Sequence, residues 1–404
     1  MKFRRPSPAS RRTAWAVAVV LLGSATPLLA DSEPAHSGPT VDIRYRHEMV
    51  DDAAFEKDAH ANTLRVRLGY RWAFATNWQL YAEGEHVESL FGDRYNSTSN
   101  DNPAYPVVAD PESDEINQAW LGYADATFQA TLGRQRVMLD NQRFFGNVGW
   151  RQNEQTFDAV SGSYRFGEDG PTVRYFYLDR VLRVFGHQNP NPLLREYSLD
   201  GHLFNISHSL PVGTLTAYAY LVENRDVATL STRTFGARWA GKQAWDGINF
   251  GWTAEWAGQS DYANNPQSQS AQYRFIEPSL EFSGLTLRAG WEVLGGNGRS
   301  GFSTPYATLH AFNGWADRFP ATPVDGLDDR YFGIGGQIRK AVWSATWHDY
   351  RADHDSQDYG HELDASLAYP FDSHWKGLLK LADYRSDGFA GDSRKVWASI
   401  EYRH

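Results

Sequence analysis

The chain has 404 residues, and its 39 Lys and Arg residues are outnumbered by 49 Asp and Glu residues, which gives a formal charge of −10 at pH 7. Binding to nucleic acid requires a net basic surface, so we expect no nucleic-acid partner. Cysteine is absent, which excludes disulfide bonds and thiolate metal sites. We expect neither a cofactor nor a metal site in this chain.

The first 30 residues have the pattern of a cleaved export signal. Basic residues precede an apolar run at 14–23, and a small residue, Ala30, ends the segment. The apolar run is shorter than the roughly 20 residues that a spanning helix needs. The basic residues are Lys2, Arg4, Arg5, Arg11 and Arg12. We expect residues 31–404 to form one domain, because no linker, repeat or low-complexity tract divides them.

Strands with two chemically different faces are the main pattern of the remaining chain. Between positions 64 and 72 every even residue is apolar, whereas the odd positions hold three arginines and a glycine. The same alternation recurs at 248–256, at 285–293 and at 395–404. One face of each segment therefore suits lipid and the other suits water.

The predicted connections alternate in length along the chain. Short turns are expected near 75–77, 129, 167–170, 211–213, 241–246, 283–284, 339–341 and 370–374. Long loops are expected at 49–61, 90–112, 139–154, 181–196, 258–270, 295–328 and 352–358. Short turns at one end and long loops at the other are typical of outer-membrane barrels, whose short turns face the periplasm.

A soluble β-sandwich also shows alternation and is the competing interpretation. The alternating segments, however, run for about nine to twelve residues, the length that crosses a bilayer at a tilt, whereas ordinary strands average about five or six. The 15 Trp and 21 Tyr residues suit aromatic girdles at two membrane interfaces. We predict an all-β, transmembrane antiparallel barrel in the bacterial outer membrane.

The barrel is expected to have about 18 strands, with 16 as the alternative. The uncertainty in number comes from segments near Leu121, Leu132 and Phe176, which alternate poorly. A barrel of either size is too wide for side chains to fill, so it should enclose an aqueous lumen. Passive transport is the function that this architecture predicts.

Basic residues fall on the polar face of many predicted strands. Those on clearly alternating strands are Arg44, Arg46, Arg65, Arg67, Arg71, Arg238 and Arg288, and those on weaker ones are Arg134, Arg136 and Arg174. The planar guanidinium matches carboxylate geometry, so an arginine-lined pore would favour polyanions. Alternatively, the arginines pair with inward acids and only hold the wall together. Those acids are Glu83, Glu85, Glu255, Glu292 and Asp364.

The long connection at 139–154 contains two adjacent phenylalanines, Phe144 and Phe145, between Arg143 and Arg151. Leaving both rings in water is unfavourable. A loop folded into the lumen would bury them and place both arginines at a constriction. Packing against neighbouring outer loops is the alternative, and it has no meaning for transport.

Two stretches resemble the alginate-export family of outer-membrane barrels. The first is Gly133-Arg134-Gln135-Arg136 followed by 144–153 and 155–160, and the second is 304–317, which begins Thr304-Pro305-Tyr306. The resemblance implies an eighteen-stranded barrel that secretes an anionic exopolysaccharide past basic lumen residues. The partners expected for the chain are outer-membrane lipid and lipopolysaccharide, an anionic polysaccharide or oligosaccharide, and periplasmic export proteins.

Three other functions were weighed against export. A porin for uptake of small anionic solutes or uronate oligosaccharides would use the same fold and much the same lumen. An outer-membrane enzyme is not expected, because the chain has no Gly-x-Ser-x-Gly elbow, and His361-Glu362 lacks the second histidine of a zinc motif. A Ser-His pair across strands, for example at His202 or His208, is the form that an enzyme would take. A surface-associated adhesion sandwich is the third alternative.

Overall fold

The computed structural model describes residues 37–404, so the predicted signal peptide lies outside the described residues. Within this range the chain forms eighteen strands. They are β1 (Gly38–Asp52), β2 (Ala59–Ala75), β3 (Trp78–Ser89), β4 (Ser113–Ala124), β5 (Phe128–Gln135), β6 (Thr156–Arg165), β7 (Thr172–Leu182), β8 (Glu196–Leu210), β9 (Gly213–Asn224), β10 (Thr232–Trp245), β11 (Ile248–Asp261), β12 (Ser270–Phe282), β13 (Leu285–Leu294), β14 (Leu327–Ile338), β15 (Ala341–Arg351), β16 (Asp358–Pro370), β17 (Trp375–Ser386) and β18 (Ser393–Arg403).

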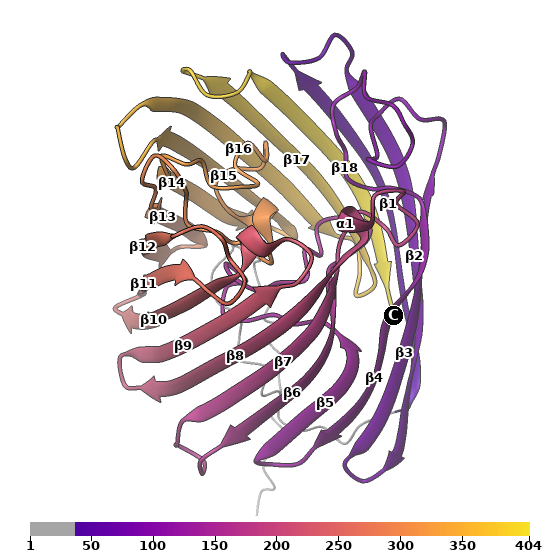
Figure 1. The fold of residues 1–404 in the computed structure, drawn as a ribbon, viewed down its shortest axis with the longest axis vertical. Coiled ribbons are helices and arrows are strands. Elements are labelled where there is room, and N and C mark those ends of the chain that lie inside the picture. Colours follow the sequence, from indigo (N-terminus) through magenta and orange to yellow (C-terminus); the bar gives the residue numbers. More distant parts are fainter. Residues whose placement is uncertain (1–36) are drawn as a thin grey trace, which may run out of the picture.

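The strands close into a single barrel (Figure 1). Each strand pairs antiparallel with the next one along the chain, and β1 pairs with both β2 and β18. Closure leaves no free sheet edge, as a membrane-spanning sheet requires. The prediction of a transmembrane antiparallel barrel with 18 strands is confirmed, and the three segments that alternate poorly are β4, β5 and β7.

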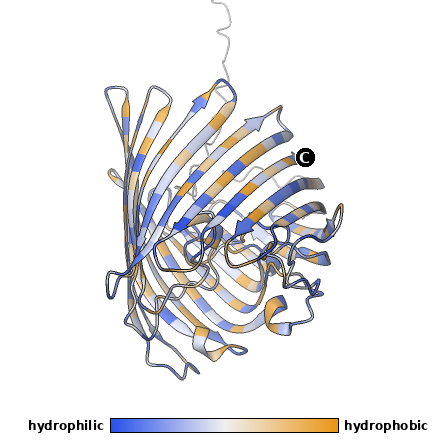
Figure 2. Ribbon diagram, turned by 90° about the horizontal axis from the view of Figure 1, so that it is seen from above, coloured by the Kyte–Doolittle hydropathy of each residue, from blue (hydrophilic) through white to orange (hydrophobic). Residues whose placement is uncertain are grey.

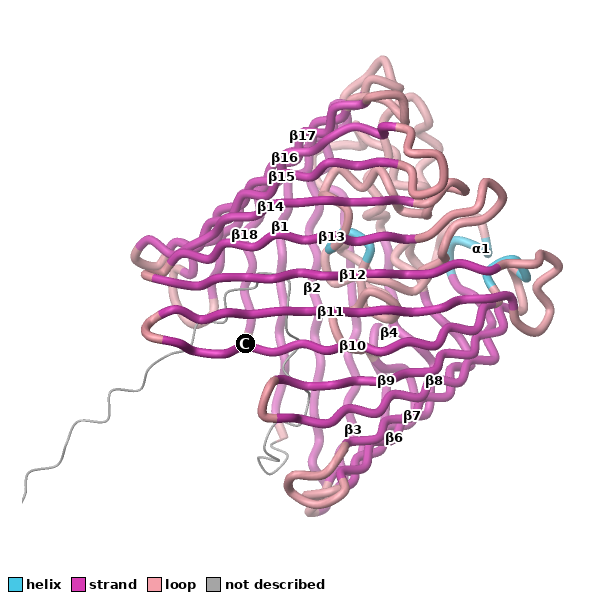
Figure 3. The backbone as a smooth tube through the Cα atoms, turned by 90° about the vertical axis from the view of Figure 1, so that its left-hand side faces the viewer, coloured by secondary structure: helices cyan, strands magenta, loops and turns pink. Residues whose placement is uncertain are grey.

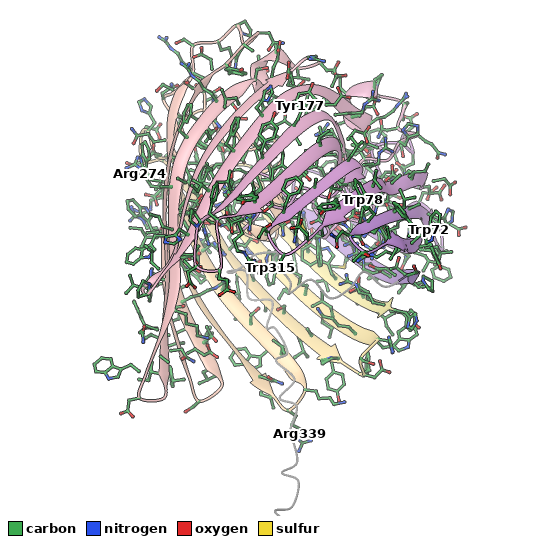
Figure 4. All side chains as sticks on the ribbon, turned by 90° about the horizontal axis from the view of Figure 1, so that it is seen from below. Trp72, Trp78, Tyr177, Arg274, Trp315 and Arg339 are labelled. Carbon is green, nitrogen blue, oxygen red and sulfur yellow. The ribbon has the colours of Figure 1, made fainter. Side chains whose placement is uncertain are left out.

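The predicted faces of the strands are also confirmed. In β2, Leu68 and Trp72 are 58% and 54% exposed on the outside, whereas Arg65 and Arg67 are 0% and 4% exposed on the inside. Figure 2 shows this as alternating hydrophobic and hydrophilic residues along the strands. Figure 4 shows Trp72 and Arg274 on the outer side of the wall, whereas Trp315 lies within the ring of strands.

Short turns gather at one end of the barrel and long loops at the other (Figure 3). Two predicted turn positions are wrong. The chain reverses at 125–127 rather than at Gln129, because Asp125 accepts hydrogen bonds from the backbone N–H groups of Thr127 and Phe128. The turn predicted at 241–246 is Asp246-Gly247, whose positive φ angles of 46° and 80° suit a tight hairpin.

The core of the molecule lies inside the barrel. The loops 136–155 and 295–326, called inner loops 1 and 2 below, fold back into the lumen, where their apolar residues pack on side chains of the wall. The helical elements described are single turns: α1 (Pro192–Arg195), η1 (Ala228–Leu230) and η2 (Leu309–Ala311). Among residues 37–404, no helix is long and apolar enough to cross a membrane.

Candidate functional site: a constriction in the lumen

Two phenylalanines anchor inner loop 1 inside the barrel. Phe144 packs edge-on against Tyr273 at 5.5 Å between ring centroids, and Phe145 stacks on Tyr306 of inner loop 2 at 5.5 Å. Both phenylalanines are buried. Of the two alternatives left open by the sequence, the structure shows the segment folded into the lumen, where it packs on the wall and on inner loop 2.

The two arginines of inner loop 1 bind acidic side chains of the wall. Arg143 Nε lies 2.8 Å from Glu292 on β13, and its Nη2 donates to Asn313 of inner loop 2. Arg151 lies 3.3 Å from Glu48 on β1 and 3.1 Å from Asp317. These contacts connect the two inner loops with each other and with two separate parts of the wall.

A cluster around Lys380 holds the inner loops against β17 and β18. The indole of Trp150 stacks on His310 with 4.5 Å between centroids and 7° between planes. Lys380 Nζ lies 4.1 Å from the Trp150 ring centroid, 3.6 Å from that of Trp315, and 2.6 Å from His310 Nε2. Trp397 of β18 completes the cluster, edge-on to Trp150 at 5.7 Å. The cluster could not be singled out from the sequence, because its members come from four separate segments.

The charges of inner loop 2 are set by this packing. Burial lowers the pKa of His310 to about 3, against the opposing effect of Asp317, so the ring is neutral at pH 7. Burial by itself would raise the pKa of Asp317, but the hydrogen bond from His310 and the charge of Lys395 hold it well below its usual value. His310 Nδ1 lies 2.8 Å from Asp317 Oδ1. The loop therefore presents one anion, Asp317, to the cations Arg151 and Lys395.

Most of the arginines predicted on the lumen face are neutralised by acids. The pairs are Arg46 with Asp110 and Glu48, Arg65 with Asp42 and Glu401, Arg67 with Glu85 and Glu154, Arg136 with Glu154 and Glu83, Arg238 with Glu255, and Arg288 with Glu277 at 3.9 Å. Burial would raise the pKa of Glu154, but Arg67 and Arg136 lower it to about 2. For these residues the mixed wall network describes the structure better than a free cationic ring.

Arg134 does not face the lumen, so its predicted position is wrong. It lies on the same face of β5 as Leu132, which is exposed on the outside, and it binds Asp158 of β6 at 2.8 Å. The inward residues of this strand are Gly133 and Gln135, the neighbours of Arg134. Because polar residues lie on both faces, the sequence does not show which face points inward. Arg136, just beyond β5, does reach the lumen acids Glu83 and Glu154.

Three predicted lumen arginines, Arg44, Arg71 and Arg174, have no carboxylate within 4 Å among residues 37–404. Arg44 is buried and binds only neutral oxygens: its Nε donates to Gln152 at 2.9 Å, and its Nη atoms donate to the carbonyls of Gly149 and Trp150 at 3.1 and 3.0 Å. Its positive charge is therefore not cancelled by a direct partner.

Acids collect on another part of the wall, where Asp329, Glu362 and Asp364 are all buried on β14 and β16. Their contacts are mostly with inner loop 2: Glu362 and Asp364 accept hydrogen bonds from the backbone N–H groups of Ala316 and Trp315. Of these acids only Asp364 was expected on the lumen face from the sequence. The constriction thus has a basic wall at β1–β2, an acidic wall at β14–β16, and two loops between them.

The comparisons with known proteins agree with this geometry. The alginate export family matches residues 39–180, which include β1, β2 and the first stretch of resemblance. No match was found among curated proteins.

Solved outer-membrane proteins share the fold at low identity. Pseudomonas aeruginosa OpdK, solved with vanillate, is 12% identical with a TM-score of 0.70, covering 91% of this chain and 98% of that chain. P. aeruginosa OccK2, in complex with glucuronate, is 12% identical with a TM-score of 0.69, covering 91% and 96%. Acinetobacter baumannii OccAB4 is 11% identical with a TM-score of 0.70, covering 93% and 100%. The chain thus has the fold of outer-membrane β-barrels, and its resemblance to the alginate-export family is confirmed over residues 39–180.

Proposed function

We propose that the barrel conducts carboxylate-bearing saccharides passively across the outer membrane. Export of an anionic polysaccharide is our first candidate for this transport. The observation that carries the proposal is the basic wall of β1 and β2, where Arg44 and Arg65 are direct cross-strand neighbours facing the lumen. Arg44 keeps an uncancelled charge there, whereas Arg65 is paired. A fixed cation in a narrow aqueous path attracts anions and matches the shape of a carboxylate.

Two comparisons support this cargo class. The family that matches residues 39–180 is described by alginate export, and alginate is a polymer of uronates. OccK2, which shares the fold, was solved in complex with glucuronate. We propose that transport involves no catalytic step. Chemical conversion of a saccharide or lipid by the folded protein would contradict this proposal.

Uptake of small anionic solutes or uronate oligosaccharides is the second candidate, and the inner loops favour it. Inner loops 1 and 2 cross the lumen and are joined by Phe145–Tyr306 stacking and by the Arg151–Asp317 pair. A path narrowed in this way suits small solutes, and a polymer would require the loops to move. Expected partners in either case are lipopolysaccharide and outer-membrane lipid, with periplasmic export proteins only in the first.

The deciding experiment measures reversal potential and flux of the refolded mature protein. In a planar bilayer with a salt gradient, the proposal predicts anion selectivity. Proteoliposomes then report the passage of uronate monomers, short oligomers and polymers against neutral saccharides of equal length. Passage of polymers supports export, and passage of monomers alone supports uptake. Cation selectivity, or absence of conductance from folded and inserted protein, would overturn both.

A further inference from the structure

A small cavity lies in the lumen directly below the cluster around Lys380. Its volume is about 150 Å³, and it is lined by Arg44, Arg46, Trp150, Lys376, Leu378, Ser399 and Glu401. It is therefore large enough for a single small solute and not for a folded polymer.

The strand register shows where the cavity lies along the barrel and which rows of inward residues line it. Lys376 on β17 is the direct neighbour of Glu401 on β18, which is the neighbour of Arg44 on β1. One step further from the short turns, Leu378, Ser399 and Arg46 form the next inward row. Lys376 follows the short turn at 371–374, so the cavity opens on the periplasmic side of inner loop 1.

The charges around the cavity do not cancel. Arg44 donates to neutral oxygens of inner loop 1, and Lys376 has no carboxylate within 4 Å in the part of the chain that the structure describes. The one acid in the lining, Glu401, is shared by Arg65 at 3.3 Å and Arg403 at 2.8 Å. Arg46 is balanced by Asp110 and Glu48. The cavity therefore keeps two positive charges, that of the buried Arg44 and that of Lys376, which is exposed to solvent.

Inner loop 1 forms a fixed roof over these charges. Trp150 has His310 stacked on its ring, and Lys380 and Arg46 lie over the same indole at 4.1 and 4.9 Å from its centroid. The indole is therefore held in place and is not available for stacking against a sugar. Recognition must come from charge and from the hydroxyl of Ser399.

From this arrangement we infer a carboxylate-binding subsite on the periplasmic side of inner loop 1, built on Arg44 and Lys376 and sized for one uronate ring. The inference rests on the proposed function. It adds the position of a binding site, a stoichiometry of one uronate ring, and the side of the membrane from which the site is reached. The carboxylate would lie between the guanidinium of Arg44 and the ammonium of Lys376, and Ser399 would bind a ring hydroxyl. A polymer in export would meet this subsite before the constriction.

The test is block of the ion current by a uronate monomer, D-galacturonate, added to one chamber at a time, with D-galactose as the neutral control. Orientation can be fixed by labelling the variant Phe91→Cys, because Phe91 is 85% exposed in the outer loop 90–112 and the sequence contains no cysteine. We expect galacturonate to block from the periplasmic side at a concentration at least fivefold lower than from the outside.

Variants separate the subsite from general lumen charge. Lys376→Gln and Arg44→Gln should each weaken the block about tenfold, and Arg44→Lys should keep most of it. The matched controls are Lys340→Gln, which removes a cation from another short turn, and Arg174→Gln, which removes a lumen arginine from β7; each should change the block less than twofold. Lys376 is exposed, so its variant should fold even if an Arg44 variant does not.

Equal block from both sides, or equal loss in the Arg174 and Arg44 variants, would overturn the subsite. If the current stays anion-selective while galacturonate has no effect at all, the subsite fails and the proposed channel stands. If the wild type is not anion-selective, the proposed function itself fails.

Discussion

Trp150 and His310 stack nearly parallel, with 4.5 Å between ring centroids, although one belongs to inner loop 1 and the other to inner loop 2. The stack is closed on one side by Lys380 of the barrel wall and lies edge-on to Trp397 at 5.7 Å. Both loops therefore share one aromatic contact, in addition to the ion pairs and apolar packing that each makes with the wall. Whatever weakens this contact should loosen both of them.

Replacing Trp150 with alanine should release the inner loops. Removal of a packed tryptophan costs about 3–5 kcal/mol, and the attraction between Lys380 and the ring is lost with it. We expect faster hydrogen exchange in residues 137–155 and in 305–318, and a larger and noisier single-channel conductance. Trp245→Ala is the control, because Trp245 is 83% exposed at a short turn. Unchanged exchange in both segments would show that the stack does not hold the loops.

Acidification should weaken the docking of inner loop 2. His310 is held neutral by burial, with a pKa of about 3, and it faces Lys380, Asp317 and Arg151. As the pH falls from about 6.5 toward 3, His310 becomes protonated when the loop is undocked but stays neutral when it is docked. The free energy that favours docking therefore falls by about 1.4 kcal/mol for each pH unit. The pKa of Asp317 is depressed, so its contribution is complete above its usual value near 3.8 and is lost below it.

Docking should therefore be strongest above pH 6.5. The measurement is single-channel conductance between pH 7 and pH 4, where we expect a rise in open fluctuations. His310→Gln should remove most of the pH dependence between 6.5 and 4, because no proton uptake then distinguishes the two states. A wild-type channel whose conductance is flat over this range would contradict the argument.

Much of the barrel could be predicted from the sequence because a spanning strand repeats one physical constraint. Lipid outside and water inside impose a period of two on every strand, so the inward position of Arg65 and the outward position of Leu68 follow from order alone. For Phe144 and Phe145 the sequence predicted only that two adjacent rings in a long loop need an apolar partner, and it left open whether that partner is the lumen or an outer loop.

The partners of the lumen arginines could not be predicted in the same way. Arg143 meets Glu292, and Arg151 meets Glu48 and Asp317, all distant in sequence, and no alternation rule says which wall a loop will reach. His310 and Asp317 lie within the second stretch of family resemblance, which was the one signal that pointed to them. Arg134 was placed inside because its short strand gives too few residues to establish parity.

Anion selectivity should depend on the unpaired arginines rather than on all lumen arginines. We expect Arg44→Gln combined with Arg174→Gln to shift the reversal potential clearly toward zero. The double variant Arg238→Met/Glu255→Gln removes an ion pair with 3.0 Å between its atoms and leaves the net charge unchanged, so selectivity should remain near the wild-type value. A larger shift in the Arg238/Glu255 variant would mean that paired residues govern selectivity.

Inner loop 2 approaches β16 so closely at Gly314 that a single methyl group should displace it. A Cβ there would lie 2.4 Å from Glu362 Oε2 and 2.2 Å from Tyr350 Oη. We expect Gly314→Ala to lower the unfolding temperature and to expose the loop to protease. Gly298→Ala is the matched control: its φ of +78° is close to the +81° of Gly314, but its nearest neighbour would be 3.5 Å away. Equal effects of the two changes would assign the cost to backbone strain alone.

A charged substitution on the lipid-facing side of the barrel should destabilise the fold more, the deeper it lies in the bilayer. Leu68 lies in the middle of β2 and is 58% exposed, whereas Val212 lies in a short turn and is 54% exposed. An arginine near the bilayer midplane costs roughly 2–4 kcal/mol, and one near the interface costs about 0–1 kcal/mol. We expect Leu68→Arg to lower the urea midpoint for folding into vesicles strongly and Val212→Arg to change it little. Equal midpoints would mean that the outer face of β2 is not in contact with lipid, because exposure is matched and only depth differs.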